Sequence, residues 1–461
     1  MATTPDAAAA PARGPAEGGA APAGTVYPKP AYAWYVTGLL LVTSVIAYVD
    51  RLILGFLIDP IKADLQLSDT EAGLLLGVAF ALFYVTMGIP IGRLIDTRSK
   101  KGVLAVCMAF WSAMTTLCGF ATSFVMLFLA RCGVGAGEAA MNPAAVSIIG
   151  DHFPKEKVAR PISVYTLSIH AGGGLAVILG GVLIQWFASL GPVSILGFEN
   201  IETWRLVFVV IGLPGLVVAL LVWMTIRDRP AGGGAPGAPR QAVPWSEVFA
   251  YLRGHAKLYG LLFGGLVSFG FYIYAVQGWY PAMLVRTYGV SPLQISTTYG
   301  VIFFTFGILG ALAVDPLLRF LNARGHADAP ALACLLAALA MTVPAAIAPL
   351  MPTFALSLAV WSVAMFGWAL TTSVSFAAIV LVTPPGMRGL MIAAYMVLMN
   401  VTGGAFGTVL VGALSDHVYG PEHLNYAIAT QAAIFMPLAA LLFAALRRPY
   451  RRAIREQEAA A

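Results

Sequence analysis

Charged residues are scarce in this sequence. Asp, Glu, Lys and Arg make up 10% of its 461 residues, whereas an ordinary soluble domain is about 25% charged. Hydrophobic residues make up 59%. This composition excludes an ordinary soluble protein and predicts one that crosses a lipid bilayer many times.

Cysteine is also rare. The four cysteines all fall within apolar stretches. They lack the density of a disulfide-rich scaffold and the close spacing of a zinc site. We interpret them as packing residues and expect neither a metal nor another cofactor. They are Cys107, Cys118, Cys132 and Cys334.

Signatures of several kinds of membrane machine are missing. The sequence has no Walker A loop for ATP and no repeated segment typical of a channel's selectivity filter. The few ionisable residues within apolar stretches do not form a persuasive set of nucleophile, base and orienting group. These absences argue against an ATP-driven pump, a channel and an intramembrane enzyme. An ion gradient is the remaining source of energy for transport.

Apolar stretches dominate what is present. A spanning helix needs roughly 20 mostly apolar residues, and the sequence predicts twelve, which makes the protein an all-α polytopic membrane protein. The stretches lie near residues 34–57, 72–92, 103–122, 124–149, 160–188, 203–226, 257–283, 295–319, 329–350, 354–383, 389–415 and 424–446.

A segment rich in Gly and Pro at residues 229–240 has the composition of a linker. It divides the chain into two halves of six spans, and the Ala-, Pro- and Gly-rich start lacks the features of a signal peptide. The predicted organisation is a disordered cytoplasmic tail at 1–30, six-helix bundles at 31–228 and 255–447, a cytoplasmic linker at 229–254 and a basic cytoplasmic tail at 448–461.

Lys and Arg outnumber Asp and Glu by 27 to 21, but their positions do not indicate a nucleic-acid partner. Cytoplasmic loops of membrane proteins collect basic residues. With the N-terminus inside, about 22 of the 27 Lys and Arg lie on the cytoplasmic side. We therefore predict a multi-pass protein of the inner cell membrane with both termini in the cytoplasm. We expect it to be a monomer.

A short pattern recurs at the ends of spans. Gly92-x-Leu-x-Asp96 ends span two and Gly412-x-Leu-x-Asp416 ends span eleven, with related residues near the end of span five and a degenerate version in span eight. Such recurrence is expected of inverted three-helix repeats within each six-helix half. The alternative is that small residues and an acid simply mark helix ends.

Two pairs of charged residues interrupt apolar stretches. Arg131 and Glu138 are seven residues apart in span four, which places them on one face of a helix, about 10.5 Å apart along its axis. Asp50 and Arg51 interrupt span one. A charge facing lipid costs at least ~2.5 kcal/mol, so such residues normally face a bundle interior or a water-filled pathway.

The segment between spans two and three, taken with twelve spans and a central linker, resembles the major facilitator superfamily. It departs from that pattern at Thr97 and Ser99, where Arg and Gly are usual. The resemblance implies the fold of that superfamily, with two six-helix halves. The matching residues are Gly92, Asp96, Arg98, Lys100 and Lys101.

Two charged motifs resemble the Spinster family in its bacterial type. They are Tyr48-Val-Asp50-Arg51 and Arg131-x-Gly-x-Gly-x-Gly-Glu138-Ala139. The resemblance implies a transporter of a lysophospholipid or sphingoid-type amphipathic lipid, and bacterial relatives look proton-coupled. Similar motifs occur in organic anion symporters of the superfamily, so a small organic anion such as a sugar acid is the alternative substrate.

The resemblance also places spans one and four side by side, so that Asp50 could reach Arg131. Asp50 and Glu138 are the candidate proton carriers, and Arg51 and Arg131 are their charge partners or the anchors of a substrate anion. On this hypothesis, a proton taken up outside loosens the hold on an arginine and is released inside. The alternative is a permanent structural ion pair.

The motif between spans two and three is predicted to lie at the cytoplasmic rim, near the start of span eleven. A helix N-terminus carries about half a positive charge and favours a nearby acid. We interpret Asp96 and its basic neighbours as a latch between the halves that favours an outward-facing state. Ordinary cytoplasmic loop chemistry explains the basic residues but not Asp96.

Uncharged aromatic and hydroxyl residues dominate the spans of the second half. An apolar cavity with few polar groups suits an amphipathic ligand. His170 could bind an anion, relay protons or simply pack, and we assign Trp279 and Tyr280 to the aromatic belt at the membrane surface. The candidates for lining the cavity are His170, Tyr165, Tyr274, Gln277, Trp368, Thr371, Tyr395 and Asn400.

Overall fold

The computed structural model describes residues 27–154, 157–166, 168–190, 193–195, 198–228, 245–384 and 387–460. Within these ranges the protein is helical apart from an antiparallel hairpin of β1 (Val193–Ile195) and β2 (Phe198–Ile201). The helices of the first half are α1 (Pro30–Leu65), α2 (Asp69–Leu76), α3 (Val78–Thr97), α4 (Lys100–Cys118), α5 (Phe124–Glu138), α6 (Met141–His152), α7 (Ala159–Thr166), α8 (Ser168–Ser189) and α9 (Thr203–Thr225).

The second half begins with α10, which precedes the first span of that half, and it includes short 3₁₀ and π-helical segments labelled η. Its elements are α10 (Trp245–Gly254), α11 (Ala256–Tyr288), α12 (Pro292–Leu312), α13 (Val314–Ala323), α14 (Ala329–Ile347), η1 (Ala348–Leu350), α15 (Phe354–Val382), α16 (Arg388–Leu398), η2 (Met399–Gly407), α17 (Thr408–Leu414), η3 (Ser415–Tyr419), η4 (Pro421–His423) and α18 (Leu424–Ala460).

The prediction of twelve membrane helices is confirmed. Within the described ranges, twelve helical segments are long and apolar enough to cross a bilayer. Several extend beyond their apolar stretch; the first, predicted near 34–57, runs over Pro30–Leu65. Hydrophobicity identifies the part of each helix that crosses the bilayer. Backbone hydrogen bonding continues the helix beyond that part into polar sequence.

The ends and the centre of the chain add detail to the predicted organisation. Residues 1–26 of the predicted N-terminal tail and residues 229–244 of the predicted linker lie outside the described residues. The remainder of the linker forms α10. The predicted basic tail continues α18 as a helix to Ala460.

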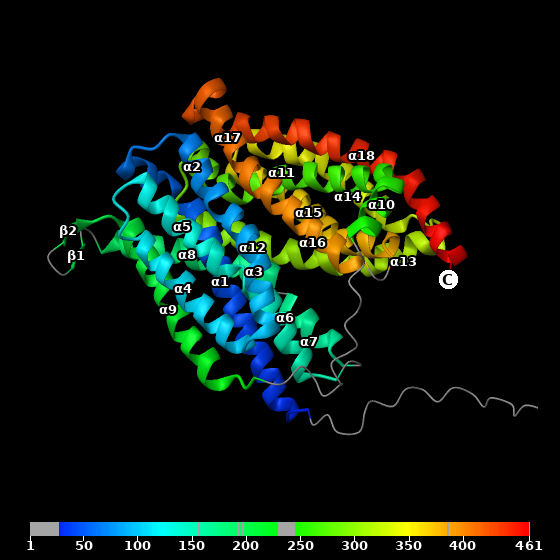
Figure 1. Cartoon of the computed structure of the whole chain (residues 1–461). Coiled ribbons are helices and arrows are strands. Elements are labelled where there is room, and N and C mark those ends of the chain that lie inside the picture. The colour runs from blue at the N-terminus through cyan, green and yellow to red at the C-terminus, as the bar shows by residue number, and fades with distance from the viewer. Residues whose placement is uncertain are drawn as a thin grey trace, which may run out of the picture.

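The two halves meet at one end and diverge toward the other, so that the molecule has the outline of a V (Figure 1). The contacts between the halves are made by α8 with α12, α2 with α17, α3 with η2 and α1 with α11. We call the end that carries α2 and α17 the junction end. The N-terminal end of α1 and the C-terminal end of α18 lie at the diverging end.

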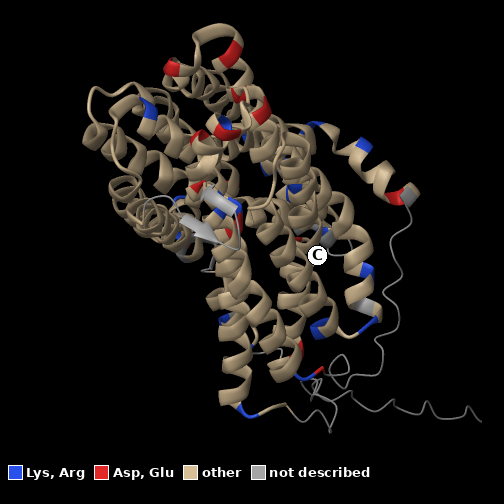
Figure 2. Ribbon diagram, turned by 90° about the vertical axis from the view of Figure 1, so that its left-hand side faces the viewer, with Lys and Arg blue, Asp and Glu red and all other residues tan. Residues whose placement is uncertain are grey.

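Charge is distributed unequally between the two ends. Figure 2 shows that Asp and Glu gather at the top, which is the junction end, whereas Lys and Arg prevail toward the bottom. The junction end is therefore mainly acidic and the diverging end mainly basic.

Span eleven is the least regular of the spans. Two π-helical segments, η2 and η3, interrupt it on either side of α17. π-helical geometry is rare and often occurs at functional sites. Both segments lie where the two halves contact each other, since η2 packs on α3 and η3 approaches α2.

The assignment of Trp279 and Tyr280 to the membrane-surface belt is wrong, because both side chains are fully buried. The indole N–H of Trp279 donates to the carbonyl oxygen of Thr408 at 2.9 Å. The hydroxyls of Tyr280 and Ser357 lie 2.9 Å apart. These aromatic residues find partners for their polar atoms inside the bundle instead of at the lipid surface.

Candidate functional site

Four charged residues from α1 and α5 form a buried cluster. Arg51 Nη2 donates to Glu138 Oε2 at 2.7 Å. Glu138 is the last residue of α5 and is 1% exposed. Arg131, about two turns earlier on the same face of α5, is also 1% exposed. Asp50 is fully buried, whereas the Arg51 side chain is 25% exposed. Arg51 is thus the member of the cluster that remains accessible.

The expected proximity of Asp50 and Arg131 is present, but through the backbone. Arg131 Nη1 donates to the carbonyl oxygen of Asp50 at 3.1 Å. The Asp50 carboxylate instead accepts from Thr115 Oγ1 at 3.2 Å. Arg131 therefore fixes α1 against α5, and Glu138 pairs with Arg51 and not with Arg131.

Aromatic rings surround the Arg51 guanidinium. Its Cζ lies 4.4 Å from the centre of the Phe80 ring, 5.3 Å from that of Tyr84 and 5.6 Å from that of Tyr48. A cation over an aromatic face gains about 0.5 to 2 kcal/mol, more when water is excluded. The rings hold the cation in place while leaving hydrogen-bonding capacity, since Arg51 Nε has no partner among the described residues.

Arg51 borders a cavity between the two halves. Three predicted lining residues, Tyr274, Gln277 and Asn400, lie on its wall. The Tyr274 hydroxyl donates to Asn400 Oδ1 at 3.3 Å, which joins α11 to span eleven. The complete wall consists of Arg51, Leu52, Gly55, Leu76, Gly77, Phe80, Ala81, Tyr274, Gln277, Gly278, Asn400, Gly404 and Thr408.

The other predicted lining residues are not on the wall of this cavity. The Tyr165 hydroxyl donates to Asn142 at 2.8 Å, Thr371 donates to the Gly367 carbonyl of its own helix, and Tyr395 lies 3.1 Å from the Ser375 hydroxyl. Trp368 packs edge-on against Phe303. The side chain of His170 lies outside the described residues. Spacing alone did not reveal that these polar groups bond within their own half.

The predicted latch motif makes its described contacts within the first half. Lys100 forms an ion pair with Asp151, and Lys101 Nζ donates to the carbonyl oxygen of Trp223 at 3.1 Å. Arg98 is exposed, and the side chain of Asp96 lies outside the described residues. In this conformation the described basic residues of the motif therefore do not bridge the halves.

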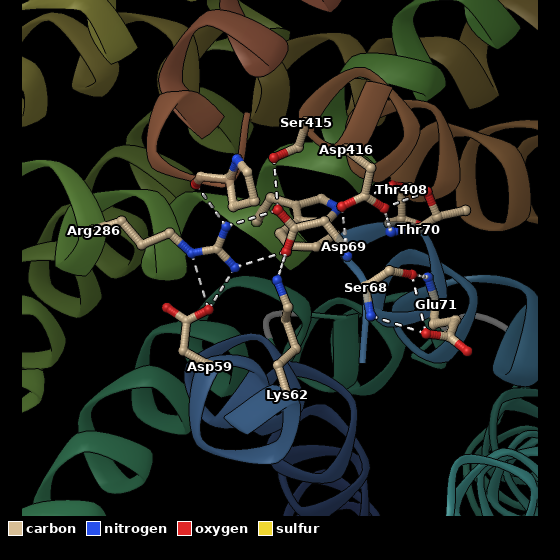
Figure 3. Close-up of polar contacts among 12 residues, drawn as sticks. Asp59, Lys62, Ser68, Asp69, Thr70, Glu71, Arg286, Thr408, Ser415 and Asp416 are labelled. Atoms are coloured by element: carbon tan, nitrogen blue, oxygen red, sulfur yellow. Dashed lines mark hydrogen bonds and ion pairs between the residues drawn. The ribbon is translucent and has the colours of Figure 1, made fainter. Parts of the chain in front are cut away.

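A second charged cluster closes the junction end (Figure 3). Asp69 is fully buried and accepts from both terminal nitrogens of Arg286 at 2.9 Å. Lys62 and the Ser415 hydroxyl also donate to Asp69. Arg286 binds Asp59 at 2.6 Å as well. We call Asp59, Lys62, Asp69 and Arg286 the junction cluster; it joins α1 and α2 to α11.

Sequence reasoning missed the junction cluster, because its residues lie just beyond the ends of apolar stretches and resemble loop charges. One signal could have found it. Basic residues are rare on the side predicted to face outward, so each one present there is a candidate for a specific ion pair. Three of them, Lys62, Arg205 and Arg286, pair with acids in the structure.

Comparisons with known proteins agree with the fold. Residues 40–408 match the family model of the Major Facilitator Superfamily. A relative in Mycolicibacterium smegmatis, an "MFS-type efflux pump", is 30% identical, and the alignment covers 93% of this chain and 96% of the relative.

Two further relatives match over shorter regions. A "Probable L-galactonate transporter" of Escherichia coli is 27% identical over 59% of each chain. The "Sphingosine-1-phosphate transporter SPNS2" of Danio rerio is 29% identical over 57% of this chain and 50% of the relative.

Among solved structures, the fold resembles that of a bacterial homologue of the human lysosomal transporter Spinster, described as inward-facing and unoccupied. The TM-score is 0.75 at 26% identity, with 93% of this chain and 98% of that chain covered. The family and these relatives are transporters rather than enzymes. The chain therefore belongs to the major facilitator superfamily, and within it resembles the Spinster transporters.

Proposed function

We propose that this transporter is proton-coupled and works by alternating access, with an anionic amphipathic lipid as its substrate. The observation that carries the proposal is the Arg51–Glu138 ion pair at the edge of the cavity between the halves. A buried carboxylate and a partly accessible guanidinium in contact can exchange partners when a proton or an anion arrives.

Charge balance links the proton to the substrate. With all four groups ionised, Asp50, Arg51, Arg131 and Glu138 carry a net charge of zero. A proton on Glu138 removes its negative charge and weakens its hold on Arg51, which then faces the cavity as an uncompensated cation. An anionic head group restores neutrality there. The protonated protein is thus the form that binds an anion best.

Asp50 has a different environment from Glu138. Its carboxylate lies away from the cavity wall and accepts from Thr115, while its carbonyl oxygen holds Arg131. We assign the proton that is exchanged with solvent to Glu138, which contacts the accessible Arg51 directly. Asp50 balances the charge of Arg131 and is the second candidate carrier.

The diverging end is proposed to face the cytoplasm. The supporting observations are the excess of Lys and Arg at that end and the likeness to an inward-facing solved structure. Cytoplasmic surfaces of membrane proteins collect basic residues. The protein then sits in the inner membrane with both termini inside, and this conformation opens inward.

A lipid substrate is supported by the Spinster-type motifs and by a relative named as a sphingosine-1-phosphate transporter. Phe80, Tyr84 and Tyr48 present apolar surface beside the Arg51 cation. A charged head group and an apolar tail match such a combination of cation and rings.

A small organic anion such as a sugar acid is the second candidate. Gln277, Asn400 and Thr408 on the cavity wall offer hydrogen-bonding groups to a substrate with several hydroxyls. A relative named as an L-galactonate transporter supports this alternative.

A substrate screen separates the two. The purified protein in proteoliposomes, with an imposed pH gradient, is offered sphingosine 1-phosphate, lysophospholipids, galactonate and glucarate. The proposal expects gradient-dependent movement of a lipid and none without the gradient. Movement of sugar acids alone would replace lipid by small anion, and movement independent of the gradient would remove proton coupling.

A further inference from the structure

The end of span eleven binds the first turn of span two by its backbone (Figure 3). An α-helix leaves its first four N–H groups without an intrahelical partner. In α2, Ser68 and Glu71 satisfy two of them reciprocally, at 2.9 and 3.1 Å. The other two, of Asp69 and Thr70, donate to the carboxylate oxygens of Asp416 at 3.0 and 2.6 Å. All four N–H groups of this first turn have a partner only because the other half supplies the Asp416 side chain.

Two further residues of span eleven, Gly412 and Thr408, contact α2 from the same helix face as Asp416. A side chain on Gly412 would overlap the carbonyl oxygen of Asp69, so only glycine permits this approach. Thr408 Oγ1 donates to the carbonyl oxygen of Gly73 at 2.9 Å. Positions 408, 412 and 416 are each four residues apart, and they follow one face of span eleven along the whole of α2.

Gly412 and Asp416 belong to the pattern that recurs at Gly92 and Asp96, the end of span two. The second copy lies at the diverging end of the molecule. There a Cβ on Gly92 would meet no atom within 4 Å among the described residues, apart from its chain neighbours and the backbone of its own helix. The glycine of one copy is therefore packed against the opposite half, while that of the other leaves room for a methyl group among the described residues.

We propose that Gly412 and Asp416 form a latch that closes the junction end on the N-terminus of α2. It is the counterpart of the latch predicted from the sequence for Gly92 and Asp96 at the other end, near the start of span eleven. Only one latch is engaged at a time, because rocking of the halves separates one end as it brings the other together. The inference rests on alternating access but requires neither substrate nor proton.

Matched glycine substitutions test the alternation. Spin labels at Ala63 and His423 report the junction end, and labels at Thr97 and Asn322 report the diverging end, in the full chain with its native cysteines replaced, reconstituted in nanodiscs. Both distances are measured by pulsed electron double resonance without substrate. A failure of the transport assays therefore leaves this test intact.

Gly412→Ala is expected to open the junction end, because its methyl group cannot fit beside the Asp69 backbone. Gly92→Ala is expected to do the reverse, since it fits the present conformation and obstructs the opposite one. Opposite shifts in the two label pairs support the alternation. Shifts in the same direction, or none for either variant, overturn it.

Asp416→Asn is the gentler variant, because it keeps the shape of the side chain but loses its charge and one acceptor. Hydrogen bonds to charged groups contribute more than neutral ones, and the ratio of junction-open to junction-closed molecules should rise roughly fivefold to thirtyfold. Glu422→Gln, an exposed acid at the same end, is the control. If Asp416→Asn leaves both distances as in Glu422→Gln, the latch is wrong even where Gly412→Ala fails to fold.

Discussion

At the scale of single residues, Glu138 differs from the other buried acids in its partner. It binds a guanidinium that borders the cavity, whereas Asp50 binds a hydroxyl inside the first half. Losing the charge of Glu138 therefore changes the charge of the cavity wall directly. The proposed mechanism therefore assigns the coupling between proton and anion to Glu138.

Glu138→Gln is expected to uncouple transport from the proton gradient. The amide mimics the protonated acid, so Arg51 stays available to an anion while no proton can be exchanged. Gradient-driven uptake into proteoliposomes should fall at least about tenfold, and binding of the substrate, measured by thermal shift, should lose its dependence on pH. Glu456→Gln, an exposed acid in the C-terminal helix, serves as the control. Normal gradient-driven uptake by Glu138→Gln would leave the Arg51–Glu138 pair a structural one.

Asp69 is the buried centre of the junction cluster, and Asp69→Asn is expected to destabilise the protein. The change removes the acid that pairs with Lys62 and leaves Arg286 paired with Asp59. Removing one partner of a buried ion pair costs about 3 kcal/mol or more. The apparent melting temperature, followed by tryptophan fluorescence in detergent, should therefore fall by several degrees.

A double variant separates pairing from general damage. Because Arg286→Gln removes one of the two cations that pair with Asp69, the two changes together should cost less than the sum of the single changes. Simple additivity would show that Asp69 and Arg286 act independently.

The residues of the two clusters differed in how readily the sequence revealed them. Asp50, Arg51, Arg131 and Glu138 interrupt apolar stretches, where any charge is conspicuous, and sequence reasoning brought them together correctly as a group. It left the pairing open, and the structure pairs Glu138 with Arg51. Asp69 looked like an ordinary loop acid, because its partner lies 217 positions away.

At the scale of elements, hydropathy predicted all twelve spans but not their internal geometry. The two π-helical segments of span eleven follow from contacts with α3, α11 and α2, which no local pattern encodes. Packing also separates the predicted cavity residues into two groups. Tyr274, Gln277 and Asn400 line the cavity. Thr371 and Tyr395 instead form hydrogen bonds within the second half.

Gly77 links α2 to α3 and tests the contact between elements. A side chain there would overlap Thr408 and the carbonyl oxygen of Gly404, in span eleven. We expect Gly77→Ala to weaken the closed junction, since overpacking typically costs about 1 to 3 kcal/mol. Transport by the variant should fall while its expression in the membrane is retained. Gly88→Ala should transport normally, because no other described part of the chain lies within 4 Å of the new methyl group, apart from the adjacent residues and the backbone of its own helix. Equal losses in both variants would point to helix propensity instead.

At the scale of the whole molecule, the sequence predicted two six-helix halves but could not indicate which end is closed. That choice depends on small differences between two sets of contacts. Here the junction end holds the ion pairs of Arg286 and the cap of Asp416, while Lys100 and Lys101 at the diverging end contact their own half.

The distribution of charge leads to the proposal that the diverging end faces the cytoplasm. Reporter fusions test this orientation. Green fluorescent protein fluoresces when it stays in the cytoplasm, and alkaline phosphatase is active only when exported. Fused after Ala461, which follows the end of α18 at the basic diverging end, the first should fluoresce and the second should be inactive. Fused after His423, at the acidic junction end, the two reporters should behave in the opposite way. Because cytoplasmic loops retain Lys and Arg, the reverse pattern would mean that the diverging end faces outward.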